Sequence, residues 1–229
     1  MANPALLLCD TDALIQIFMV AETQLLRLLR DRYAVQPCIV QDVDGELAWN
    51  STYRDRFDED RRKALSAGLL LPLDAAAVAR VVPGPTAAAQ VMLARATALG
   101  QALNDIIDVG EAYTHAAAAL LAMPAMSNDY KALKALGEAQ RPSASPTLRS
   151  WDLLAFGFHD GALTTRDLDQ ARKRLNDESE WLPRVFRNQG CGKALAQFDA
   201  RLLVLGKPGV GTQPLSPQPH EVALHLAPV

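Results

Sequence analysis

The sequence has few cysteines, few aromatic side chains and no large excess of charge, and each shortage excludes a class of protein. Its three cysteines are too far apart in the chain for a zinc finger, and their odd number argues against a disulfide framework. The formal net charge of −3 gives no sign of a strong nucleic-acid binder, although it leaves room for a local basic face. No apolar run is long enough to span a bilayer, and no basic segment precedes an apolar run as in a signal peptide. We therefore expect a cytoplasmic protein without a membrane anchor.

Short apolar runs and longer amphipathic segments alternate along the chain. With 229 residues, 49% of them hydrophobic, the chain can form one sizeable core or a core with an appendage. The short runs predict strands at 5–9, 33–40 and 123–127, and either a strand or a buried connection at 68–73. Helical spacing predicts helices at 13–32, 42–49, 75–80, 87–103, 109–122, 130–139, 148–158, 165–176 and 182–205.

This alternation predicts an α/β fold, namely a three-layer α/β/α sandwich around a short, mainly parallel central sheet with a C-terminal helical extension. We expect residues 1–140 to form the core and residues 141–205 to form the helical extension packed on it. Residues 206–229 are rich in proline and glycine, so we expect an irregular tail there.

Carboxylates follow the predicted strands or lie early in the helices after them. Ligands of open α/β sheets bind outside the carboxyl ends of the strands, where these side chains would meet. A divalent ion such as Mg²⁺ takes oxygen ligands and keeps several waters, so one or two direct carboxylates suffice and others can hold the waters. The acids at these places are Asp10, Asp12, Glu46, Asp108, Glu111 and Asp129.

The segments around these acids resemble the motifs of a known family. An apolar run ends in Asp10-Thr11-Asp12, and a second motif runs from Pro37 to Glu46-Leu47. The others are Asp108-Val109-Gly110-Glu111 and Ser127-Asn128-Asp129. In order and separation they resemble the PIN-domain family of small metal-dependent ribonucleases, which includes toxins of bacterial toxin–antitoxin pairs. The resemblance covers roughly residues 5–190.

The resemblance implies an endoribonuclease that uses Mg²⁺ or Mn²⁺ to hydrolyse RNA phosphodiester bonds. Asp10, Glu46, Glu111 and Asp129 would be its catalytic acids, with Asp10, Glu111 and Asp129 holding the metal. It further implies an RNA substrate, an antitoxin partner and a homodimer. Accessory candidates near the quartet are Asp12, Asp108, Asn128 and His115.

Two positions depart from the family pattern. Asp12 stands where the family has Asn or Ser, which adds a charge beside the metal, and Ser127 stands for the common Thr. His115 lies one turn after Glu111, so the two share a helix face.

Other interpretations of the same residues stay open. Asp108 and Glu111 have the spacing of a capping box, and the other aspartates could cap the helices that follow them. The chain could then be a catalytically inactive PIN-fold module that binds RNA or protein. Asp10-Thr11-Asp12 also resembles the haloacid-dehalogenase phosphatases, but Leu14 replaces their Thr. The glycines at 206 and 211 lack the lysine and helix of a P-loop.

Overall fold

The computed structural model describes residues 5–21, 23–49, 54–80, 82, 84–121, 123–129, 147–159, 161–177, 184–187 and 189–194. It confirms the α/β fold, with a parallel sheet between helices and further helices at the C-terminal side. Within the described residues, no helix has the length and apolarity needed to cross a membrane.

The sheet has the strand order β3-β2-β1-β4-β5, and every pair of neighbours is parallel. Its strands are β1 (Ala5–Cys9), β2 (Val35–Ile39), β3 (Leu71–Pro72), β4 (Ala125–Met126) and β5 (Thr147–Leu148). The central strand β1 places Leu8 opposite Cys38 on one side and opposite Ala125 on the other. Residues 6–9 are at most 1% exposed, since a parallel strand covered on both faces must be apolar throughout.

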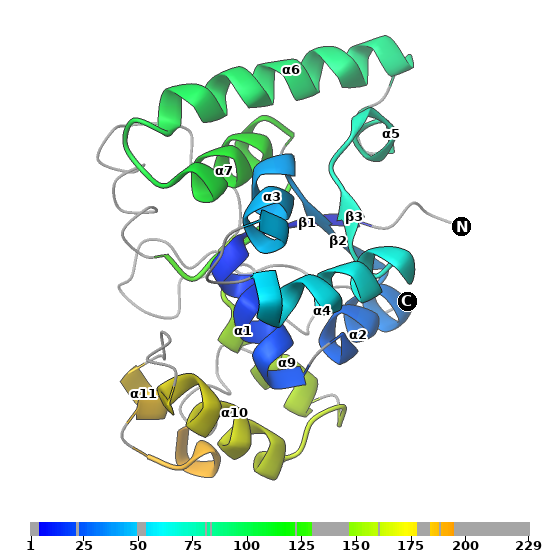
Figure 1. The fold of residues 1–229 in the computed structure, drawn as a ribbon. Helices are drawn as coiled ribbons and strands as arrows, with labels where there is room; N and C mark the ends of the chain where they lie inside the picture. The colour runs from blue at the N-terminus through cyan, green and yellow to red at the C-terminus, as the bar shows by residue number, and fades with distance from the viewer. Residues whose placement is uncertain are drawn as a thin grey trace, which may run out of the picture.

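Helices cover both faces of this sheet. The helices of the described residues are α1 (Thr11–Ala21), α2 (Gln24–Tyr33), α3 (Gln41–Trp49), α4 (Arg54–Ser66), α5 (Ala75–Val78), α6 (Thr86–Leu103), α7 (Val109–Leu121), α9 (Ser150–His159), α10 (Thr165–Asp177) and α11 (Arg184–Arg187). In Figure 1, α6 and α7 lie on one side of the strands, whereas α1, α2 and α9 lie on the other. The short sheet is thus the middle layer of three.

The predicted helix at 13–32 is wrong as a single helix, because α1 and α2 are separate. The change of direction lets the chain return to the sheet at Val35, at the same end where β1 begins. Ala34 makes the tight exit from α2, with a left-handed φ of 50° and its N–H bonded to the carbonyl of Leu29. The apolar pattern runs through both helices, so periodicity alone did not reveal the break.

Other boundaries also differ from the predictions. The strand at 33–40 begins at Val35, and the run at 68–73 contributes only the two residues of β3. The two-residue strand β5 was not predicted, because its residues show no apolar run. Of the predicted helix at 182–205, the structure describes α11 and a short helical segment at 191–194, and the predicted helix at 130–139 and the tail lie outside the described residues.

The C-terminal helices pack closely on the rest of the chain. Trp151 of α9 is fully buried, and its ring lies 4.2 Å from that of Phe186 between centroids. Arg174 of α10 donates to the carbonyl of Met19 in α1 at 3.0 Å. These contacts join α9 to α11 and α10 to α1.

Candidate metal centre

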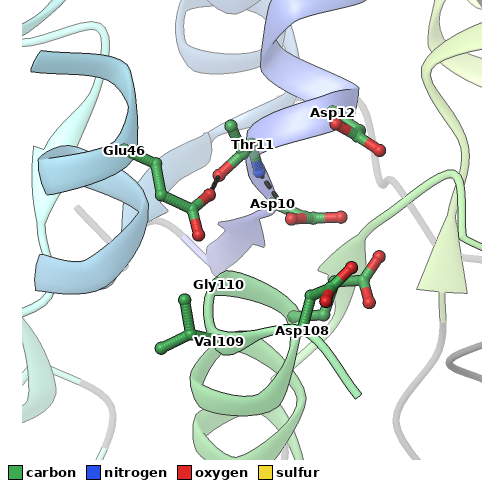
Figure 2. Close-up of a pocket in the computed structure, with 8 residues that line it drawn as sticks. Asp10, Thr11, Asp12, Glu46, Asp108, Val109 and Gly110 are labelled. Carbon is green, nitrogen blue, oxygen red and sulfur yellow. Dashed lines mark hydrogen bonds between the residues drawn. The ribbon is translucent and has the colours of Figure 1, made fainter. Parts of the chain in front are cut away.

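A pocket of about 260 Å³ opens where β1 ends and where α1 and α7 begin. Of the eight described residues that line it, five carry carboxylates and none carries a positive charge. Figure 2 shows that these side chains come from three places in the fold. These places are the junction of β1 and α1, the helix α3, and the start of α7. The lining residues are Asp10, Thr11, Asp12, Glu46, Asp108, Val109, Gly110 and Glu111.

Asp10 is the most buried acid of the cluster, with only 2% of its surface exposed. Its Oδ1 accepts from the N–H of Thr11 at 2.6 Å, and its Oδ2 accepts from the hydroxyl of Ser127 at 3.0 Å. Burial and the nearby charge of Asp12 nevertheless raise the pKa of Asp10 to about 7. Hydrogen-bond donors thus orient both carboxylate oxygens of Asp10. No positively charged side chain among the residues that line the pocket balances its negative charge.

Glu46 reaches the pocket from α3 across a long sequence separation. The hydroxyl of Thr11 donates a short hydrogen bond to its Oε2. A Cβ added to Gly110 would lie 2.9 Å from Glu46 Oε2 and 3.0 Å from Oε1, so the carboxylate rests directly on the first turn of α7. Arg61 of α4 braces α3 through a 2.6 Å ion pair with Asp44. The position of Glu46 therefore depends on three different helices.

Glu111, which lines the pocket, and Asp129 form a carboxyl pair. Burial, the charges of Asp10 and Asp129, and a side-chain hydrogen bond with Asp129 raise the pKa of Glu111 to about 9. Burial is the first cause, because Glu111 is 7% exposed. With its pKa raised to about 9, Glu111 keeps a proton at neutral pH that a bound cation could replace.

Asp12 and Asp108 are more exposed and lie at the outer part of the cluster. The pKa of Asp12 is raised by partial burial and by the charges of Asp129, Glu46 and Asp108. Asp12 therefore adds charge to the same pocket and does not point away from it.

Two of the predicted accessory residues lie behind the pocket lining. His115 is 7% exposed, burial lowers its pKa to about 4, and its Nε2 has no hydrogen-bond partner among the described residues. The charge of Asp129 opposes this lowering of the pKa, which shows that His115 lies near the carboxyl pair. Because burial outweighs that charge, the imidazole of His115 is neutral at pH 7. Asn128 instead turns its Oδ1 to the start of α9, 3.0 Å from the N–H of Ser150.

All four acids of the predicted quartet come together, but residues that hold them were not recognised from the sequence. Thr11 and Gly110 were named only as residues of the motifs, and Ser127 only as a replacement for the common Thr. Their roles depend on contacts with Glu46 and Asp10 made across long sequence separations. The only local signal is that they stand next to the acids in the chain.

The donor chemistry of the cluster fits a hard divalent cation. Its ligand atoms are carboxylate oxygens, which suit Mg²⁺ and Mn²⁺, and a cation would relieve the repulsion that raises the pKa values of Asp10 and Glu111. In the part of the chain that the structure describes, no three His, Cys, Asp or Glu side chains already stand in a metal-holding arrangement. Binding would therefore require the carboxylates to turn toward a common centre and Glu111 to release its proton.

Comparison of the chain with protein-family models, with curated proteins and with solved structures finds no match. What the structure shows is an α/β fold with a parallel sheet that collects carboxylates at the ends of its strands.

Proposed function

We propose that the protein is a PIN-like endoribonuclease that uses Mg²⁺ or Mn²⁺ to hydrolyse RNA phosphodiester bonds. One observation carries the proposal: five carboxylates from three elements line one pocket without a positive charge, and Asp129 adjoins them through Glu111. Helix capping does not require the acids of separate elements to converge. The resemblance to PIN-domain motifs supplies the reaction type.

In this proposal Asp10, Glu111 and Asp129 hold the cation, while Glu46 and Asp12 orient water. The bound cation would supply Lewis-acid stabilisation of charge on the phosphodiester and a more acidic water. Ser127 keeps one oxygen of Asp10 oriented through its hydroxyl, and Thr11 keeps Glu46 against the start of α7. The buried, neutral His115 leaves the negative field of the cluster undiminished.

The direct test is cleavage of a labelled single-stranded RNA by the purified chain. We expect cleavage with Mn²⁺ or Mg²⁺, none with excess EDTA, and recovery when Mn²⁺ is added back. A DNA of the same sequence serves as the control for substrate class. Cleavage that persists in EDTA would contradict the proposal, and so would an absence of Mn²⁺ binding in calorimetry.

A second candidate is a PIN-fold binding module without catalysis. It is favoured by one observation, the lack of a ready three-ligand arrangement among the described residues. Such a module would bind RNA equally well with and without Mn²⁺ and would not cleave it. The resemblance also leads us to propose an antitoxin partner and a homodimer, which co-purification and light scattering can test.

Gly110→Ala should separate activity from stability. Alanine favours a helix over glycine by about 1 kcal/mol, so the variant should be at least as stable as the wild type. Its Cβ would displace the carboxylate of Glu46, however, and we expect Mn²⁺-dependent cleavage to fall about 10-fold. Cleavage rate and thermal melting are the two measurements.

Gly45→Ala is the matched control, because Gly45 precedes Glu46 in α3 and an added Cβ there meets nothing within 4 Å. Equal loss of cleavage in both variants would show that the contact between Gly110 and Glu46 has no special part in the site.

A further inference from the structure

A buried polar junction links the end of β4 to the start of α9. The Oδ1 of Asn128 accepts from the N–H of Ser150 at 3.0 Å and lies 3.1 Å from its hydroxyl. The same hydroxyl donates to Oε1 of Gln16 in α1 at 2.6 Å. All three side chains are at most 7% exposed, so these bonds form away from solvent.

Asn128 caps α9 from outside that helix. The first N–H groups of a helix lack partners within it, and at the buried start of α9 the amide oxygen of Asn128 supplies one to Ser150. The Nδ2 of Asn128 has no hydrogen-bond partner among the described residues. The oxygen half of this amide therefore carries the connection.

The junction reaches the acidic cluster through the two neighbours of Asn128. Ser127 donates through its hydroxyl to Asp10, and the N–H of Asp129 donates to that hydroxyl oxygen at 3.2 Å. The N–H of Ser127 donates to the carbonyl of Leu148 in β5 at 2.9 Å. The main chain of this segment is thus tied to β5, and the side chain of Asn128 is tied to the start of α9.

We propose that Asn128 is a positioning residue for Asp129, which it holds against Glu111 by fastening residues 127–129 to the first turn of α9. That Asn128 thereby affects metal binding rests on the proposed function. Residues 127–129 belong to no helix or strand, so beyond the bond of Ser127 to β5 the course of this segment depends on the side-chain bonds of Ser127 and Asn128. Residues that orient metal ligands from behind typically change metal affinity by about 10- to 100-fold when removed.

The proposal has two readouts on the full-length protein. Asn128→Ala should speed hydrogen exchange at the amides of Ser127 and Asp129 at least about 10-fold, and should weaken Mn²⁺ binding about 10- to 100-fold in calorimetry. Asn128→Asp keeps an acceptor oxygen for Ser150 and should restore slow exchange at a pH that keeps the new carboxyl group neutral. Ser150→Ala, which keeps the N–H, should have a smaller effect in the same direction.

Thr164→Ala is the matched control, because it removes a side-chain cap from α10 at a site outside the acidic pocket. The Thr164 oxygen accepts from the N–H of Asp167 at 3.2 Å. This variant should lose some thermal stability but keep wild-type Mn²⁺ affinity and wild-type exchange at residues 127–129.

The outcomes distinguish the two proposals. Unchanged exchange in Asn128→Ala would overturn the positioning role, and so would wild-type Mn²⁺ affinity in a variant whose exchange is faster. Faster exchange together with a wild type that binds no Mn²⁺ would overturn the proposed function but leave the fastening of Asp129 by Asn128 supported.

Discussion

Asp10→Asn should abolish Mn²⁺-dependent RNA cleavage, with a loss of at least about 1,000-fold, while the protein stays folded. The amide can still accept from the N–H of Thr11 and can donate to the oxygen of Ser127, so both contacts of Asp10 have a replacement. What it cannot replace is the negative charge that the cation needs. The measurement is single-turnover cleavage at saturating Mn²⁺.

The same substitution should raise the melting temperature in EDTA. Asp10 is buried among other carboxylates, and its raised pKa means that its charge costs folding free energy above about pH 7. Removing the charge removes that cost. Asp177→Asn, at the exposed end of α10, is the control and should change neither cleavage nor melting. A variant that cleaves RNA normally would remove Asp10 from the proposed site.

The metal-free protein should lose stability as the pH rises from about 6.5 to 9. Glu111 keeps its proton to about pH 9 when folded, against an ordinary pKa of 4.5, and Asp10 keeps its proton to about pH 7. The folded state therefore binds more protons than the unfolded chain in this range, and the free energy of unfolding falls with rising pH, by about 3 kcal/mol in total.

Below pH 6.5 a different group opposes this trend. The pKa of His115 is lowered to about 4 from 6.5, so between these values the unfolded chain binds the extra proton and stability rises with pH. Urea unfolding at several pH values in EDTA measures the profile. Glu111→Gln should flatten the fall above pH 6.5, and an unchanged slope in that variant would contradict the assignment.

Mn²⁺ should reverse the loss at high pH. A ligand present at 100 times its dissociation constant stabilises the folded state by about 2.7 kcal/mol, and here the gain should grow from pH 6.5 to 9 as Glu111 gives up its proton. Melting curves with and without Mn²⁺ at each pH test this. A stabilisation independent of pH would show that the cation binds elsewhere.

Much of the fold and of the acidic cluster could be predicted from local sequence. The run that ends at Asp10 is apolar at every position because β1 is covered on both faces, and such a run is visible without knowledge of its neighbours. The break between α1 and α2 was not visible, because the apolar pattern continues across it. The strand β5 was missed because two residues carry no periodicity.

The sequence by itself determined that carboxylates follow the strands of a parallel α/β sheet, because strand periodicity and the identity of the next residue are local properties. Only the tertiary structure decided which side chains hold those acids. Thr11 meets Glu46 across 35 positions and Asn128 meets Ser150 across 22, and both contacts depend on how helices pack around the sheet. The raised pKa values of Asp10 and Glu111 arise there too, because burial and neighbouring charges exist only once the chain has folded.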